Sequence, residues 1–214
     1  MKNEISLAKR SELHLMRRVW HIVVGLLGLI AYYSLELPIL VFAHFSIVIA
    51  ILGFVVDFQR LKRPALNQML ERHFGPIMRR SEKFSFSGLP FYALGVALSI
   101  YLYQEEIAVL AILFLIFADP IASVCGVFLG RDRLLPNKTL QGTISAFVIC
   151  FIIVMSYFVI TGNHSKNIII FAFFSSIVGA LSELVSAFNI DDNLTIPVLS
   201  GGAMVVLNVW FQVL

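Results

Sequence analysis

Charged residues are scarce in this chain of 214 residues. Asp, Glu, Lys and Arg make up 14% of it, whereas hydrophobic residues make up 59% and the mean hydropathy is +0.89. A soluble domain of this size could not bury so much apolar surface. The composition therefore excludes an ordinary soluble protein and predicts a polytopic membrane protein.

Cysteine is also rare, with only Cys125 and Cys150. Both lie in apolar runs, so we interpret them as buried thiols and not as a disulfide framework. The sequence also lacks an internal repeat, a low-complexity tract, a cleavable signal peptide and the Gly-Lys-Ser/Thr element of a Walker A loop. We therefore expect a single membrane domain, residues 1–214, with no soluble appendage.

What the chain does contain is a series of apolar runs, each about long enough to span a bilayer as a helix. Seven of them are present, at about residues 19–35, 38–56, 85–103, 107–129, 143–160, 168–188 and 196–214. The predicted fold is therefore an all-α polytopic membrane protein with about seven transmembrane helices.

The basic residues are distributed unevenly between the segments that connect these runs. If the N-terminus is cytoplasmic and the spans alternate, fifteen of the sixteen Lys and Arg residues lie inside and only Lys166 lies outside. This asymmetry follows the positive-inside rule. It predicts that the C-terminus lies outside, and that the basic loop 130–142 and the turn 189–194 share the cytoplasmic face.

The segment 58–84 is charged but carries a helical pattern. Apolar residues recur in it at helical spacing, and they are Leu66, Met69, Leu70, Phe74 and Ile77. This pattern predicts a short amphipathic helix that lies in the membrane interface. Attraction to anionic lipids and gating of substrate access are both open as its role.

An acid inside the fourth apolar run, Asp119, is the first candidate functional residue. Such an acid costs about 3 kcal/mol or more at mid-helix and usually marks a functional site. On a helix it shares one face with Ser123, Gly126 and Gly130. Close helix packing explains the glycines but not the acid. Pro120 frees a backbone carbonyl and is expected to interrupt the helix at this point.

The basic loop that follows carries Arg131, Arg133 and Lys138. Cations and glycines at helix ends can hold phosphate oxygens. Any cytoplasmic loop also carries Lys and Arg as a topology signal. The charge of this loop therefore leaves both interpretations open.

A second intramembrane acid, Glu183, lies in the sixth run, and Asp191, Asp192 and Asn193 follow at its cytoplasmic end. Their oxygens suit Mg²⁺, which prefers a few carboxylates together with phosphate oxygens and water. A polar turn with helix caps is the alternative, with Pro197 near the start of the seventh span. That alternative accounts for Asn193 and Pro197 but does not require so many acids.

The start of the first run places Arg17, His21 and Gly25 near one helical face, next to Arg18. Arginines that snorkel to the interface are the ordinary explanation. His21 lies one turn inside the span, where it could pair with an acid.

In this arrangement the chain resembles the CTP-dependent lipid kinase family, which includes dolichol kinase, phytol kinase and yeast-type diacylglycerol kinase. The matching elements occur in the family's order between residues 12 and 202. They are Arg17, Arg18, His21, Gly25, Asp119, Pro120, Gly126, Gly130, the stretch 138–142, Glu183, Ser186 and the stretch 192–197. One residue departs from the pattern, because Gln141 stands where the family usually has an acid.

The resemblance implies transfer of the γ-phosphoryl group of CTP to the hydroxyl of a lipid alcohol such as a polyprenol, phytol or diacylglycerol. It implies Mg²⁺ or another divalent cation, and a site on the cytoplasmic side of the membrane. The expected partners are the nucleotide and a lipid in the bilayer, with no nucleic acid.

The resemblance also suggests a role for each residue. Asp119 and Asp192 would hold the metal, and Glu183 would accept the hydroxyl proton, or would exchange roles with Asp119. The residues expected to contact the nucleotide are Gly126, Gly130, Arg131, Arg133, Lys138, Gly142 and Asn193. The candidate phosphate or lipid contacts are Arg17, Arg18, His21, Ser186 and Pro197.

Two other functions are consistent with these features. Phosphatidate cytidylyltransferase shares the broad architecture, but its signature, Pro-Gly-His-Gly-Gly followed by Asp-Arg-x-Asp, is absent. A small transporter of anionic lipids would also use buried acids and basic loops. The internal inverted repeat that would favour a transporter is not found.

Overall fold

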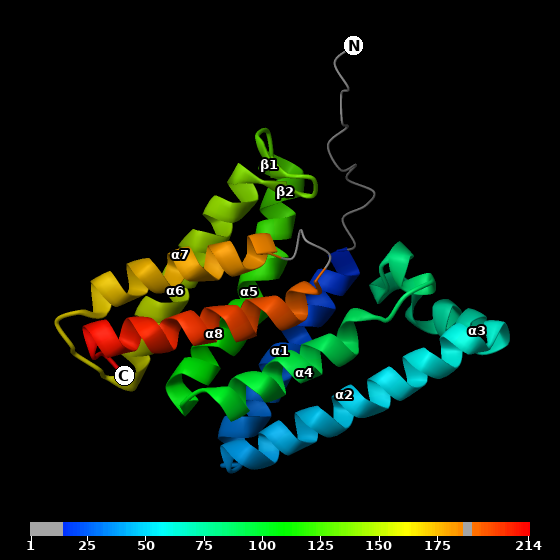
Figure 1. The fold of residues 1–214 in the computed structure, drawn as a ribbon, viewed down its shortest axis with the longest axis horizontal. Helices are drawn as coiled ribbons and strands as arrows, with labels where there is room; N and C mark the ends of the chain where they lie inside the picture. Colours follow the sequence, from blue (N-terminus) through cyan, green and yellow to red (C-terminus); the bar gives the residue numbers. More distant parts are fainter. Residues whose placement is uncertain (1–14, 186–189) are drawn as a thin grey trace.

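The computed structural model describes residues 15–185 and 190–214 (Figure 1). The helices are α1 (Leu15–Ser34), α2 (Ile39–Lys62), α3 (Pro64–Phe74), α4 (Gly88–Leu102), α5 (Glu105–Leu129), α6 (Leu140–Thr161), α7 (Ile168–Val185) and α8 (Asp192–Phe211). The shorter elements are the 3₁₀ turns η2 (Gly75–Ile77) and η3 (Arg80–Lys83) and the strands β1 (Arg133–Leu135) and β2 (Lys138–Thr139).

Among the described residues, six helices are long and apolar enough to cross a membrane, namely α1, α2, α5, α6, α7 and α8. This confirms the prediction of an all-α polytopic membrane protein. The remaining predicted span is α4, whose 15 residues are fewer than the roughly 20 that a bilayer requires. The count of seven spans and the orientation of the termini stay predictions.

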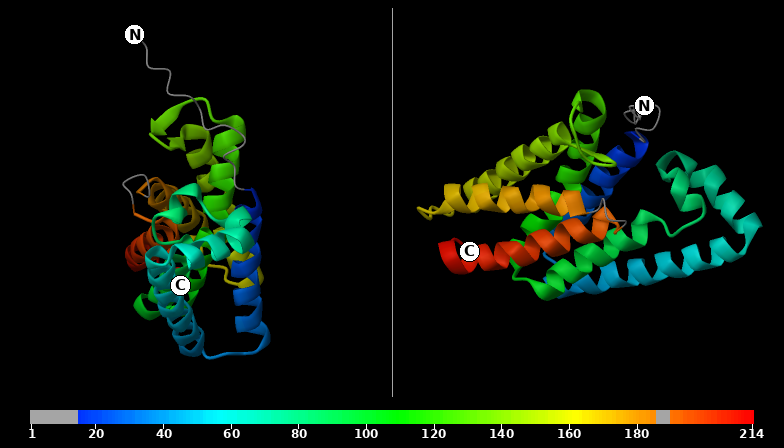
Figure 2. Two further views of the ribbon diagram at one scale, coloured as in Figure 1. Left: turned by 90° about the vertical axis from the view of Figure 1, so that its right-hand side faces the viewer. Right: turned by 45° about the horizontal axis from the view of Figure 1, so that its top comes forward.

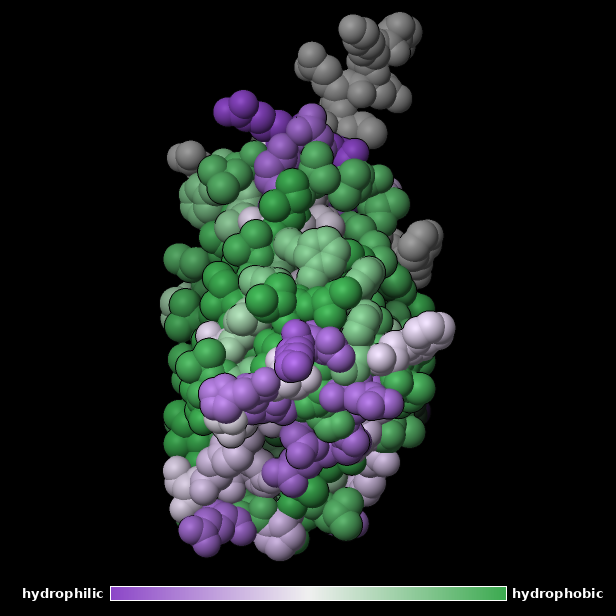
Figure 3. All heavy atoms as spheres, turned by 90° about the vertical axis from the view of Figure 1, so that its left-hand side faces the viewer, coloured by the Kyte–Doolittle hydropathy of each residue, from purple (hydrophilic) through white to green (hydrophobic). Residues whose placement is uncertain are grey.

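Large apolar side chains cover the outside of the molecule. Val159, Ile160 and Trp210 are 76%, 83% and 78% exposed. Figure 3 views the side that carries the C-terminus and the loop between α6 and α7, and hydrophobic residues cover most of this face. A soluble monomer rarely exposes so large a contiguous apolar surface. The outer surface of these helices therefore suits a lipid environment.

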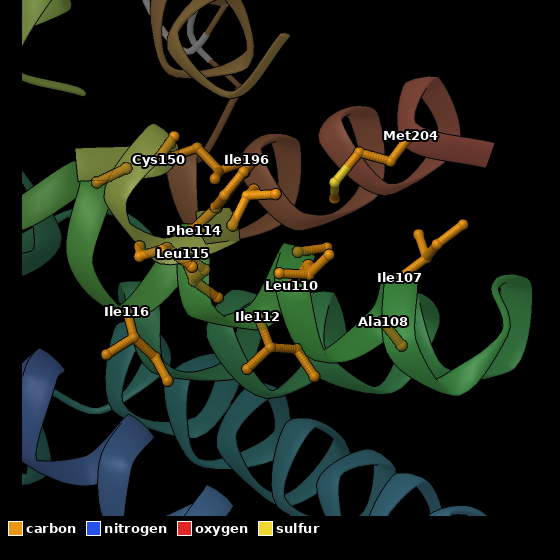
Figure 4. Close-up of a cluster of buried hydrophobic side chains, with 14 of the residues drawn as sticks. Ile107, Ala108, Leu110, Ile112, Phe114, Leu115, Ile116, Cys150, Ile196 and Met204 are labelled. Atoms are coloured by element: carbon orange, nitrogen blue, oxygen red, sulfur yellow. The ribbon is translucent and has the colours of Figure 1, made fainter. Parts of the chain in front are cut away.

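Helix α5 forms the centre of the bundle. It contacts α1, α4, α6, α7 and α8. Of its most apolar stretch of 18 residues, 72% is buried, against 17% of the corresponding stretch of α2. Figure 4 shows its side chains, among them Leu110 and Phe114, packed with Cys150 of α6 and Ile196 of α8. An acid carried by this helix is therefore surrounded by protein.

The other helices are arranged around α5 in a sequence of pairs. Helices α7, α8, α4 and α2 lie side by side in that order, and α6 packs on α7 (Figure 1). Helices α1 and α2 are consecutive in sequence but diverge from each other (Figure 2). The first packs mainly on α5 and the second mainly on α4.

Pro120 and Pro197 lie inside helices, and neither interrupts its helix. The break expected at Pro120 is wrong, because α5 continues through it to Leu129. Pro197 lies inside α8, which begins at Asp192 and is capped by the side chain of Asp191. Each proline still leaves the carbonyl four residues earlier without its helical partner, and nearby helices pack against these points.

The segment 58–84 is more broken than the periodicity predicted. Helix α2 continues to Lys62, α3 has 11 residues, and two 3₁₀ turns follow. Pro64 opens α3, because proline is tolerated in the first helical turn. The position of α3 in the membrane interface stays a prediction.

The basic loop is folded as a short antiparallel hairpin, in which Arg133 of β1 pairs with Thr139 of β2. Sequence periodicity gave no sign of these strands, because they are only three and two residues long. The hairpin brings the end of α5 back to the start of α6.

We predict that Gly95→Ala destabilises the protein. A Cβ atom at Gly95 would clash with the backbone carbonyl oxygen of Asn193, and this backbone cannot move without separating α4 from α8. Overpacking of this kind costs about 1–3 kcal/mol, so the midpoint of thermal unfolding in detergent should fall. Gly75→Ala is the control, since its Cβ would meet nothing within 4 Å; equal midpoints would refute this packing.

Candidate functional site

Three of the ion pairs that connect distant segments contain an acid predicted from the sequence. They are Arg18 with Asp119, Arg79 with Asp192, and Lys138 with Glu183. Their side chains come from α1, α5, the loop between η2 and η3, β2, α7 and the start of α8. We call these six residues the ion-pair cluster.

Asp119 lies in the centre of the molecule and is 2% exposed. Its Oδ2 accepts a hydrogen bond from Arg18 Nη1 at 2.7 Å, and the same guanidinium donates to the hydroxyl of Ser123. Asp119 and Ser123 therefore share the face predicted from their spacing. The pair removes the cost of an isolated charge among apolar helices.

Asp192 makes a two-pronged contact with Arg79, whose Nη2 is 2.8 Å from both carboxylate oxygens. Asp191 accepts from Asn193 through its backbone N–H at 3.0 Å and its Nδ2 at 2.7 Å. Burial and the Asp192 carboxylate raise the pKa of Asp191 to about 6. Two adjacent carboxylates thus share one guanidinium at the start of α8.

Lys138 of the hairpin donates to Glu183 of α7, and the two side chains are 14% and 4% exposed. Glu183 is therefore a buried acid, as the sequence predicted. Because Lys138 is on β2, this pair fixes the hairpin over the end of α7.

The three pairs lie within electrostatic range of one another. The charges of Lys138 and Arg18 act on Asp192, as does that of Arg79. Burial lowers the pKa of Arg79, but Asp192, Asp119 and Asp191 outweigh this effect and raise it. The structure therefore brings Asp119, Glu183 and Asp192 into one site with three cations.

Gln141 occupies the position at which the resembled family usually has an acid. Its Oε1 accepts from the backbone N–H groups of Arg131 and Asp132 at 3.0 and 3.3 Å, and its Nε2 donates to the Asp132 carboxylate at 2.8 Å. An acid could accept the same two bonds but would face Asp132 with a like charge. Gln141 therefore stabilises the hairpin.

Three predicted nucleotide contacts pack around Thr139 of the hairpin. A Cβ added at Gly126, Gly130 or Gly142 would come within 3.2 Å of the Thr139 side chain. At Gly142 it would also lie 2.7 Å from the backbone oxygen of Ala122. These glycines let α5, the hairpin and α6 approach closely, and their contact with a nucleotide stays a prediction.

His21 does not pair with an acid among the described residues. Its Nε2 lies 2.9 Å from the carbonyl oxygen of Leu115, so this nitrogen carries the proton and donates it. Its ring meets Tyr92 edge to face, with 4.7 Å between centroids. Arg17 is used separately, in a 2.8 Å pair with Glu82.

The predicted residues are thus distributed over several places. Arg131 is exposed on the hairpin, and Arg133 donates to the carbonyl of Pro136 at 3.3 Å. Asn193 packs beside Gly88, and its Nδ2 lies 3.3 Å from that carbonyl oxygen. Ser186 lies outside the described residues.

Sequence reasoning missed Arg79 and a second group of buried charges beside it. Arg60 is 2% exposed; it pairs with Asp57 and donates to the backbone oxygens of Glu82 and Ser85, each at 2.7 Å. The sequence did carry one sign of this group. The helical pattern of apolar residues stops after residue 78, and the serine-rich charged stretch that follows does not continue an amphipathic helix.

The carboxylates fit a metal ion that arrives with phosphate, and not an all-protein cage. Within residues 15–185 and 190–214, no group of three or more His, Cys, Asp or Glu side chains is placed to hold a metal. Mg²⁺ usually takes one or two carboxylates together with substrate phosphates and water. Asp119 and Asp192 supply carboxylates of the kind that Mg²⁺ takes, and their binding of a metal stays a prediction.

Comparison with known proteins gives a consistent result. A model of the cytidylyltransferase family matches residues 3–188. The CTP-dependent diacylglycerol kinase 1 of Schizosaccharomyces pombe is 35% identical over 159 residues, which cover 69% of this chain and 72% of that protein. The proteins of the same name from Saccharomyces cerevisiae and Eremothecium gossypii are 30% and 29% identical over 210 residues, covering 86% of this chain and 70% and 64% of theirs. No solved structure matches the chain.

We predict that Arg79 and Asp192 depend on each other for stability. Arg79→Gln leaves Asp191 and Asp192 without their cation, and Asp192→Asn leaves Arg79 with only the longer contact to Asp191. In the Arg79→Gln background, Asp192→Asn removes a carboxylate that has already lost its partner. The double variant should therefore lose less than the sum of the single losses, with an interaction free energy of about 0.5–3 kcal/mol. Titration with a denaturing detergent measures it. Arg72→Gln, on the exposed side of α3, is the control, and strict additivity would show that the pair contributes nothing.

Proposed function

We infer the activity from the relationship: the chain belongs to the cytidylyltransferase family, and within it to the CTP-dependent lipid kinases. We propose that it transfers the γ-phosphoryl group of CTP to the hydroxyl of a lipid alcohol. The observation that carries this proposal is the ion-pair cluster, in which three acids and three cations from distant segments meet in one site.

Such a cluster suits phosphoryl transfer, because this reaction depends on positioning and charge neutralisation more than on covalent chemistry. Arg18, Arg79 and Lys138 are held in place by the acids until phosphate oxygens replace those acids as their partners. Arg131 and Arg133 of the hairpin add positive charge nearby. The cations would thus position the triphosphate and stabilise the charge that develops during transfer.

Asp119 and Asp192 would hold a divalent cation, with Asp191 beside them. When bound, Mg²⁺ would neutralise part of the charge on the phosphate oxygens. The remaining acid, Glu183, is buried next to Lys138. We assign it the role of accepting the proton from the lipid hydroxyl, with Asp119 as the alternative.

Diacylglycerol is the first acceptor to test, since the named relatives are CTP-dependent diacylglycerol kinases. Polyprenols and phytol belong in the same panel, because they present the same reacting group, a hydroxyl on an apolar body. The distribution of Lys and Arg supports a cytoplasmic site, where CTP is available.

Phosphatidate cytidylyltransfer is the second candidate, and the description of the matching family favours it. That reaction would join the cytidylyl group to an anionic lipid and release diphosphate. It is distinguished from the kinase by the fate of the γ-phosphate, which a kinase leaves on the lipid.

The decisive experiment measures transfer of label from γ-labelled CTP to a panel of lipid alcohols by the purified protein with Mg²⁺. We expect a labelled lipid phosphate, and loss of at least about 100-fold in Asp119→Asn, a range typical of removing a charged group that acts in the transition state. Glu106→Gln, an exposed acid at the other end of α5, should keep full activity.

A folded protein that transfers no label to any lipid would refute the kinase. Release of labelled diphosphate with phosphatidate would establish the cytidylyltransferase in its place. The thermal unfolding midpoint of Asp119→Asn would show whether its loss of activity comes from misfolding.

A separate prediction concerns donor choice. Because Gln141 bonds the hairpin backbone and Asp132, Gln141→Glu should leave the ratio of CTP to ATP use unchanged within about twofold, in keeping with the indirect effect of a surface charge. The same variant should loosen the hairpin, which limited proteolysis measures. A large change in the donor ratio would show that position 141 contacts the nucleotide.

A further inference from the structure

A cavity of about 440 Å³ lies between α1, α2, α3 and α4. This volume is in the range of small-molecule binding sites. Most of its wall is apolar, and Trp20 and Val24 of α1 line it together with Ile49 and Leu52 of α2. The cavity thus lies where α1 and α2 diverge (Figure 2), and apolar side chains line most of it.

One part of the cavity wall is polar and joins the ion-pair cluster. His21 and Asn193 both line the cavity. Asn193 follows Asp192 in the chain, and the charges of Asp119 and Asp192 both act on His21. A group bound against His21 and Asn193 would therefore lie next to the acids assigned to phosphoryl transfer.

The hydroxyl of Tyr92 lies behind the cavity wall and not in the cavity. Tyr92 lines the cavity, and its buried Oη has no hydrogen-bond partner among the described residues. Gly25 leaves the room for this oxygen, because a Cβ there would clash with it. This oxygen lies against Gly25, which does not line the cavity, so a molecule in the cavity would meet the rest of the Tyr92 side chain and not its hydroxyl.

The charges along the described part of the cavity wall balance one another. Arg17 pairs with Glu82 at 2.8 Å, and Arg60 pairs with Asp57; all four residues line the cavity. An anionic head group would have to break one of these buried pairs, which leaves an uncompensated charge. A neutral head group needs only hydrogen bonds.

The cavity wall is partly exposed. Trp20 of α1 and Leu52 of α2 line it and are 49% and 59% exposed. Leu70 and Phe74 of α3 line the cavity as well, which favours the interpretation of this segment as a gate. A chain could therefore extend sideways between α1 and α2 into lipid.

Building on the proposed function, we propose that this cavity binds the acceptor as a neutral lipid alcohol and excludes anionic lipids such as phosphatidate. The head group lies against His21 and Asn193, and the apolar tail lies between Trp20 and Leu52. The lipid hydroxyl then faces the ion-pair cluster past His21 and Asn193. Lipid selection thus depends on a cavity wall without net charge.

Trp20 allows binding to be measured without nucleotide. The chain has two tryptophans, so Trp210→Phe leaves Trp20 as the only one. In nanodiscs of unlabelled lipid, dilute diacylglycerol with brominated acyl chains should quench Trp20 saturably. Brominated phosphatidate at the same dilution should quench it no more than brominated bulk lipid does.

Two variants in this background test the assignment. Val24→Phe fills the cavity and should weaken binding by about tenfold or more through overpacking. Val23→Phe, on the exposed face of the same helix, should bind like the parent protein.

A second pair of variants guards against misfolding of Val24→Phe. Ile49→Phe fills the cavity from the facing wall, and Ile51→Phe, on the exposed face of α2, is its control. Equal affinities within both pairs would refute the cavity as the lipid site. Phosphatidate that binds as tightly as diacylglycerol would refute selection by charge. Saturable diacylglycerol binding without label transfer from CTP to any lipid of the panel would keep the cavity and refute the proposed kinase.

Discussion

Charge among apolar helices is the constraint on which this structure depends. An unpaired carboxylate at membrane depth is costly, and Asp119 lies in α5, the helix with the most surrounding contacts. Its partner, Arg18, comes from α1 and also bonds Ser123. This one interaction connects the first helix to the central one. The same need for a counter-charge brings Arg79 to the start of α8 and Lys138 to the end of α7.

The interactions that hold the helices together are also those that the proposed reaction would use. A buried pair contributes little net stability, since desolvation offsets the attraction, but loss of one partner is strongly destabilising. Such pairs can exchange partners when a ligand supplies charges of both signs. A triphosphate with its metal would do so, because phosphate would take the cations and the metal would take the carboxylates. The ion-pair cluster therefore suits the ligand of the proposed reaction.

Phosphorylation of a lipid requires a polar and an apolar ligand to meet, and the proposed sites assign one region of this fold to each. The cluster includes Lys138 of the hairpin, whereas the cavity lies between α1, α2, α3 and α4. His21 and Asn193 lie where the two regions join. The cavity wall has no net charge, whereas the neighbouring cluster concentrates charged groups. This difference in charge would keep a neutral lipid and a polyanion apart except at the reacting atoms.

Hydropathy and local spacing by themselves determined the membrane class, the apolar helices and the buried acids Asp119 and Glu183, because these depend on neighbours in the chain. Only the tertiary structure decided the partners of those acids, since Arg18 and Asp119 are 101 residues apart. It also decided that Arg79 joins the cluster, that the basic loop is a hairpin, and that Tyr92 has no partner. Such facts depend on how helices cross, and the periodicity of one helix does not record which other helix it meets.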